Sequence, residues 1–243
     1  MSAAAVNTES RCAEFPEQEK RMTFQVAAIG TDGIVLGSDR RQNIYSERDA
    51  DGFDALIPGV SEKLIYSASR EFVVGFAGGP TVEPLARALA EQPRGALIGA
   101  SLFPTVQRLH HEIPFYGQTR DTILLADCYA PNTVSMITRT GATLAPVTPI
   151  TQWITTGSNS VPARFLMQHF WRKVPVDALV PLVLLTLHCA CKEGEGSIGE
   201  GMDIVLLKEQ TWQPLKSYDV DGGKTEELWH QFEKYTHSLL FRP

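Results

Sequence analysis

The residues that could carry chemistry begin with Thr23 and Asp39, at the two ends of a predicted β-hairpin. Two apolar runs, residues 26–29 and 34–36, flank Asp32-Gly33, a pair that favours a two-residue turn because both residues tolerate positive φ. A hairpin brings its ends together, so we expect Thr23 and Asp39 to be neighbours although sixteen positions separate them. A threonine can act as a nucleophile when it begins a mature chain, because its own α-amino group then activates its hydroxyl.

This hairpin resembles the opening of a proteasome β-type subunit, a member of the N-terminal nucleophile (Ntn) hydrolases, and is especially similar to the bacterial members. Thr23, Asp32-Gly33 and Asp39-Arg40-Arg41 match the family's catalytic threonine, turn and strand end. Later segments keep the likeness in order: Lys63-Leu64-Ile65, Val74-Gly75-Phe76-Ala77-Gly78-Gly79 and Thr156-Gly157-Ser158. The resemblance extends from Thr23 to Leu207, and the ordered set is more specific than any single motif.

The resemblance implies roles for these residues. Thr23 would be the nucleophile, and a charged Lys63 beside it would lower the pKa of the terminal amine and assist the hydroxyl proton. Asp39 would orient Lys63 and keep it charged, because an opposite charge favours the ionised form. The Gly75 amide would donate to the oxyanion, a contribution of about 3 kcal/mol to the barrier. Ser158 matches the family serine that hydrogen-bonds near the terminal amine.

The family's last element is altered in this sequence. The family has an Asp and a Ser separated by two residues in the loop before the final core strand. Ser197 matches the serine, but Glu193 or Glu195 must replace the aspartate.

Taken one at a time, the matched residues have ordinary structural interpretations. Asp39 and Lys63 could form a surface ion pair, and Gly75 could be a close-packing glycine. Ser158 could cap the following helix, and the glycine-rich segment 193–201 could be a flexible loop. Only their order in the hairpin context favours the catalytic interpretation.

Composition narrows the class of protein. The chain has 243 residues, 43% of them hydrophobic, and a net charge of −6, which fits one domain, or at most two, and argues against a nucleic-acid partner. The four cysteines, Cys12, Cys128, Cys189 and Cys191, show no C-x-x-C spacing, so we expect reduced thiols. We also expect no metal and no cofactor. Residues 42–62 read as a surface loop whose D-A-D-G fragment lacks the other oxygens of a calcium loop.

The remaining pattern predicts an α+β protein. Strands are expected at residues 72–76, 122–128, 133–138, 150–156 and 203–207, and helices at 81–92, 97–112, 162–173, 176–191 and 225–240. Segregated runs of strands and helices favour antiparallel sheets. The resemblance implies a four-layer αββα sandwich of two antiparallel sheets flanked by helices, the Ntn hydrolase fold, as one domain over residues 23–243.

No secretory signal is visible in residues 1–21, and the apolar run from Val174 to Cys191 contains Asp177, Pro181 and His188, which favours a buried helix over a membrane span. We expect a cytoplasmic protein without a membrane partner. Residues 1–22 read as a disordered extension, a propeptide, or an upstream over-reading of the gene, because Met22 before Thr23 resembles a start site trimmed by methionine aminopeptidase.

The expected function is a threonine-type endopeptidase subunit of a homo-oligomeric, self-compartmentalising ring that hydrolyses peptides or unfolded proteins. An Ntn amidohydrolase acting on a small amide and a non-catalytic ring subunit are the alternatives. The sequence leaves open whether an ATPase serves the ring.

Overall fold

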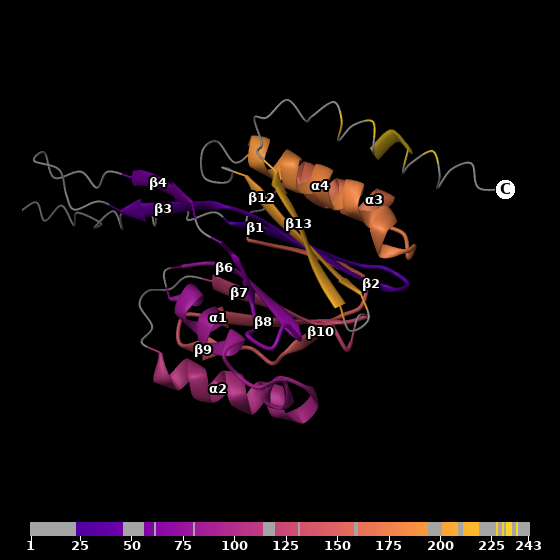
Figure 1. Cartoon of the computed structure of the whole chain (residues 1–243). Helices are drawn as coiled ribbons and strands as arrows, with labels where there is room; N and C mark the ends of the chain where they lie inside the picture. Colours follow the sequence, from indigo (N-terminus) through magenta and orange to yellow (C-terminus); the bar gives the residue numbers. More distant parts are fainter. Residues whose placement is uncertain are drawn as a thin grey trace, which may run out of the picture.

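The computed structural model describes residues 23–45, 56–60, 62–79, 81–113, 120–130, 132–157, 160–193, 201–208 and 211–218, and helical residues 227, 230, 232–234 and 237. Four layers are stacked in Figure 1: helices α3 and α4, a first sheet, a second sheet, and helices α1 and α2. Both sheets are antiparallel throughout. The predicted α+β class and the αββα sandwich are confirmed.

The first sheet contains the hairpin at its centre. Its order is β11-β1-β2-β12-β13, with bounds Trp153–Gly157, Phe24–Ile29, Gly33–Asp39, Met202–Lys208 and Thr211–Tyr218. Helices α3 (Val161–Phe170) and α4 (Val176–Glu193) cover its outer face. Strands β1 and β2 are buried along their whole length, because both of their faces are covered.

The second sheet has the order β10-β8-β7-β6-β5, with β9 paired to β8. The bounds are Thr148–Ile150, Val134–Thr140, Arg120–Asp127, Phe72–Ala77, Leu64–Tyr66 and, for β9, Thr143–Leu144. Helices α1 (Val82–Ala90) and α2 (Leu102–Glu112) lie on its outer face, with short 3₁₀ turns η1 (Arg94–Ala96) and η2 (Gly99–Ser101) between them. Leu85 and Leu89 of α1 belong to one buried apolar cluster with Val74 of β6, as the helical spacing predicted.

A third apolar cluster fills the space between the sheets. From β1 it takes Ala27 and Ile29, whereas Val26 and Ala28 face the α3–α4 side. Side chains alternate along a strand, so Gln25, and Thr23 just before the strand, lie on the face of β1 that is turned to the second sheet.

The turn of the hairpin differs from the prediction. The last pair is Ile29 with Ile34, Gly30 N donates to Gly33 O at 2.8 Å, and the exposed tip is Thr31-Asp32. Positive φ does not occur at Gly33, so the prediction of a turn centred on Asp32-Gly33 is wrong. The glycine is needed for another reason: a Cβ there would lie 2.3 Å from Leu207 O of the neighbouring strand.

The prediction of a surface loop over residues 42–62 is also wrong at both ends, where strands form. Strands β3 (Arg41–Tyr45) and β4 (Leu56–Val60) pair as an antiparallel ribbon that extends away from the sandwich in Figure 1. Their sequences hide the strands, because β4 contains Pro58 and Gly59, residues that usually interrupt strands. The D-A-D-G fragment lies outside the described residues.

One predicted strand, residues 150–156, is divided between the two sheets. Strand β10 pairs with β8 of the second sheet, and after residues 151–152 the chain continues as β11, which pairs with β1 of the first. Strand β13 was not predicted. Helix α4 contains Pro181 and is buried against the first sheet, and among the described residues no helix is long and apolar enough to cross a membrane.

Candidate active site

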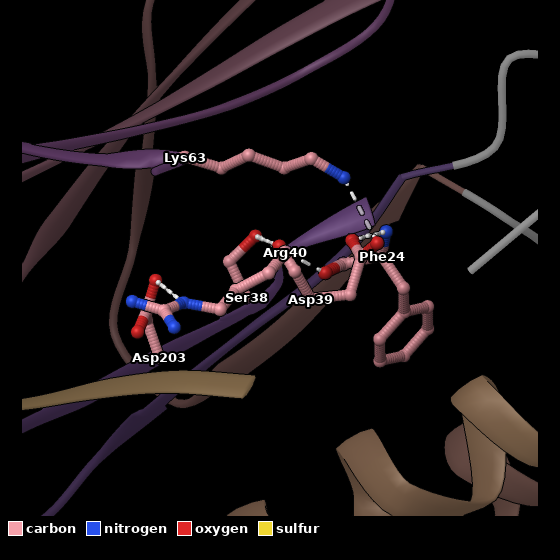
Figure 2. Close-up of polar contacts among 6 residues, drawn as sticks. All are labelled: Phe24, Ser38, Asp39, Arg40, Lys63 and Asp203. Atoms are coloured by element: carbon pink, nitrogen blue, oxygen red, sulfur yellow. Dashed lines mark hydrogen bonds and ion pairs between the residues drawn. The ribbon is translucent and has the colours of Figure 1, made fainter. Parts of the chain in front are cut away.

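The hairpin register brings Asp39 to the start of β1. Gln25 pairs with Ser38, so Asp39 lies opposite Phe24, and Phe24 N donates to Asp39 Oδ1 at 2.8 Å (Figure 2). Ser38 Oγ donates to Phe24 O at 3.4 Å. The predicted proximity of Thr23 and Asp39 thus takes a specific form: Asp39 binds the amide immediately after Thr23.

Lys63 reaches the same carboxylate from the second sheet. Its Nζ donates to Asp39 Oδ2 at 2.9 Å, and the side chains of Lys63 and Asp39 are only 3% and 0% exposed. Lys63 stands just before β5, and its carbonyl accepts from Phe76 N of β6 at 3.2 Å. Figure 2 shows the extended Lys63 side chain ending at Asp39. A surface ion pair, the ordinary interpretation of these two residues, is therefore wrong.

A buried ion pair is stable only if further hydrogen bonds satisfy its charged groups, because removing both charges from water is unfavourable. Here the two oxygens of Asp39 are divided between Lys63 Nζ and Phe24 N. Both donors hold the carboxylate in one orientation. Asp39 thereby connects the second sheet, through Lys63, to the backbone next to Thr23, a residue that is only 8% exposed.

Gly75 lies inside β6, opposite Leu64 of β5 and Leu124 of β7. Because Phe76 N is directed to Lys63 O and successive amides point to opposite edges of a strand, the Gly75 N–H points to the β7 side. A Cβ at this position would lie 3.1 Å from Gln25 Nε2, so the glycine also makes room for the fully buried Gln25. Its role as an oxyanion donor stays a prediction, which this direction of the N–H does not itself support.

The other predicted site residues are not placed by the structure. Ser158 and Ser197 lie outside the described residues. Glu193 ends α4, but its side chain is outside the described part of the chain, as is the alternative, Glu195. Their assignments stay predictions.

Two polar features near the site were missed by sequence reasoning. The thiol of Cys191, on α4, has its pKa raised to about 12, first by burial and then by the negative charge of Asp39, while Lys63 acts in the opposite direction. Arg40 Nε donates to Asp203 Oδ2 of β12 at 2.9 Å. Burial and the charge of Asp203 raise the pKa of Tyr66 to about 12. The spacing of these residues does not group them, because three of them come from α4, β5 and β12 and Arg40 follows β2.

The raised pKa values of two buried thiols decide whether either could act as a nucleophile. Cysteine attacks as the thiolate, and Cys191 and Cys128 both have pKa values raised by burial, to about 12 and about 11. Both thiols are therefore protonated at neutral pH. Within the described residues, no group of three His, Cys, Asp or Glu side chains could hold a metal ion.

Comparison with known proteins gives a structural match without a sequence match. No protein-family model matches the chain, and no curated protein sequence matches it significantly. Solved structures do match: Anbu from Hyphomicrobium sp. strain MC1 has a TM-score of 0.59 at 15% identity, covering 89% of this chain and 94% of that one. A mutant Anbu from the same organism gives 0.59 at 14% identity, covering 89% and 96%.

Anbu from Yersinia bercovieri, described as an ancestral beta-subunit, gives a TM-score of 0.58 at 14% identity and covers 89% of this chain and 94% of its own. At such low identity the match concerns the fold and not the chemistry. This chain thus has the fold of these Anbu proteins.

Proposed function

We propose that the chain is a threonine-type peptidase subunit with Thr23 as its N-terminal nucleophile. The observation that carries the proposal is the buried Asp39 carboxylate, which binds Lys63 Nζ at 2.9 Å and the amide after Thr23 at 2.8 Å. A buried ion pair adds little net stability to a fold, because both charges lose their hydration. Its position beside a threonine at the end of a strand favours a catalytic role.

The chemistry follows from a free Thr23 amine. The Thr23 hydroxyl oxygen attacks the scissile carbonyl carbon, and the hydroxyl proton passes to the α-amine, which then gives it to the leaving amine. The C–N bond of the substrate breaks, and an ester remains on Thr23 Oγ. Water hydrolyses that ester, releases the carboxylic acid and restores the hydroxyl.

Lys63 and Asp39 contribute to this reaction through their charges. The Lys63 ammonium, held by Asp39, stabilises negative charge that develops near Thr23 Oγ during attack. Gly75, Ser158, Ser197 and Glu193 are carried into the proposal from the resemblance alone. Peptide-bond hydrolysis in a homo-oligomeric ring is part of the same proposal.

Substitution of Thr23 provides the test. Thr23→Ala removes the nucleophile but only a hydroxyl and a methyl group, so the chain should fold while peptide hydrolysis falls by about 1,000-fold or more. Thr23→Ser keeps a hydroxyl and should keep measurable turnover. Thr31→Ala, at the exposed tip of the same hairpin, is the matched control and should be as active as the wild type.

Two readouts are needed. Fluorogenic peptide hydrolysis reports turnover, and intact-mass analysis after treatment with a threonine-reactive β-lactone reports covalent labelling at Thr23. Wild-type turnover by Thr23→Ala would show that the mechanism is wrong. Cleavage of unfolded casein supports a peptidase, whereas hydrolysis confined to small amides would replace it with an amidohydrolase.

A further inference from the structure

Gly157, the last residue of β11, lies against the backbone of Thr23. It pairs with Phe24 and has a φ of +90°, a conformation that residues with a side chain rarely adopt. A Cβ at this position would lie 1.7 Å from Thr23 O and 2.7 Å from Thr23 C. Both the backbone conformation and the contact therefore require glycine.

The carbonyl of Thr23 and the amide of Phe24 belong to one peptide group, and this group is held from two sides. Gly157 lies against its carbonyl oxygen, and Asp39 Oδ1 accepts a hydrogen bond from its N–H at 2.8 Å. One residue further along both strands, Thr156 Oγ1 donates to Gln25 Oε1 at 3.4 Å. These contacts fix the register of β11 on β1 beside the proposed nucleophile.

We propose that Gly157 is a positioning residue that sets the place of Thr23 relative to Lys63. The inference rests on the proposed function, because it concerns the same nucleophile. Cβ contacts with other heavy atoms essentially never fall below 3.0 Å, so a Cβ now 1.7 Å from Thr23 O would require a shift of at least 1.3 Å. A misplacement of about 1 Å in a reacting group can lower the rate by about 100-fold.

The chain offers a matched control at the other end of β1. A Cβ on Gly30 would lie 2.6 Å from Val174 O and 3.0 Å from Val176 N, so Gly30→Ala also introduces a clash with backbone. That clash is at the end of the strand away from Thr23. Comparison of the two alanine variants separates displacement of the nucleophile from general damage to the strand.

The experiment uses the full chain with Gly157→Ala, Gly30→Ala and the wild type. Far-UV circular dichroism gives the folded fraction of each protein. The rate of β-lactone labelling at Thr23, measured by intact mass, is divided by that fraction, and kcat and KM are measured on a fluorogenic peptide. We expect Gly157→Ala to lose about 10- to 100-fold in labelling rate and kcat per folded molecule with KM little changed, and Gly30→Ala to keep wild-type values.

Equal values for Gly157→Ala and the wild type, or equal losses in both alanine variants, would overturn the inference while leaving the proposed function intact. If Gly157→Ala is unfolded at 25 °C, the same rates are measured at 10 °C with trimethylamine N-oxide, which favours folded states. A Gly157→Ala chain still unfolded there, while Gly30→Ala folds, shows a purely structural glycine and also overturns it. Absence of label on Thr23 of the wild type would instead defeat the proposed function.

Discussion

Asp39→Asn should lower the free energy of unfolding by about 3–5 kcal/mol, the usual effect of removing one partner from a buried ion pair. The Lys63 and Asp39 side chains are 3% and 0% exposed and joined at 2.9 Å. Asparagine keeps an oxygen that can accept from Phe24 N but carries no charge. The Lys63 ammonium would then be buried without its counter-charge.

Lys63→Met should also destabilise the protein, although by less, because the Asp39 carboxylate would still accept from Phe24 N. The double variant Asp39→Asn/Lys63→Met removes both charges and should regain most of the loss. The resulting interaction energy should be about 3–5 kcal/mol, at or above the upper end of the usual range for residues in direct contact and within the range for close charge pairs. A typical domain has only about 5–15 kcal/mol of stability, so the single variants should be visibly less stable.

Urea unfolding followed by tryptophan fluorescence measures these differences, at one protein concentration because assembly would add to the apparent stability. Arg87 and Glu83 form the control pair: they are joined on the surface of α1, with side chains 57% and 27% exposed. Arg87→Met and Glu83→Gln should each change stability by about 0.5 kcal/mol or less.

Activity separates the structural role of the pair from its catalytic role. The double variant should be stable yet inactive, because the charge beside Thr23 is gone. Single variants within about 1 kcal/mol of the wild type, or a double variant no more stable than the singles, would refute the reasoning from burial.

Three further predictions follow from the structure and the proposal. Intact-mass analysis of native protein should show a species that begins at Thr23, and an active protein that begins upstream would contradict the assignment. If residues 1–22 are normally removed by autolysis, the Thr23→Ala variant should keep them. If translation begins at Met22, the variant should still give a short product. Light scattering should detect a particle of many subunits, and a clean monomer at micromolar concentration would count against the ring. Folding raises the Cys191 pKa from 9.0 to about 12, so between these pH values the unfolded state binds fewer protons and the stability falls as the pH rises. Cys191→Ala should reduce that fall by about 2–3 kcal/mol at pH 11. An unchanged pH dependence of stability in urea titrations would exclude Cys191 as the cause.

Much of the fold was predictable because local patterns of apolar residues indicated its strands and helices. The buried strands of the hairpin and β6 are continuous apolar runs, and α1 has helical apolar spacing, which are direct signals of secondary structure. Strand β13 was missed because it mixes polar and apolar residues and contains Pro214. Proline is tolerated at a sheet edge, and β13 is an edge strand. The strand is therefore recognised by its pairing with β12 and not by its own sequence.

The candidate site was predictable in part. The residue types and their order indicated Thr23, Asp39 and Lys63, and the hairpin accounted for the meeting of the first two. Whether Asp39 and Lys63 form a weak surface pair or a buried one depends on the elements that cover them, and those elements are remote in sequence. The same holds for Cys191, whose pKa responds to Asp39 across the boundary between a helix and a sheet.

The sequence by itself determined the pairing of β1 with β2, because two apolar runs joined by a short polar turn have few other ways to bury themselves. The tertiary structure decided why particular glycines are needed. Gly33 and Gly157 are required by the carbonyls of Leu207, in β12, and of Thr23, just before β1. Such contacts exist only once the sheet has assembled, so no local pattern around either glycine can reveal them.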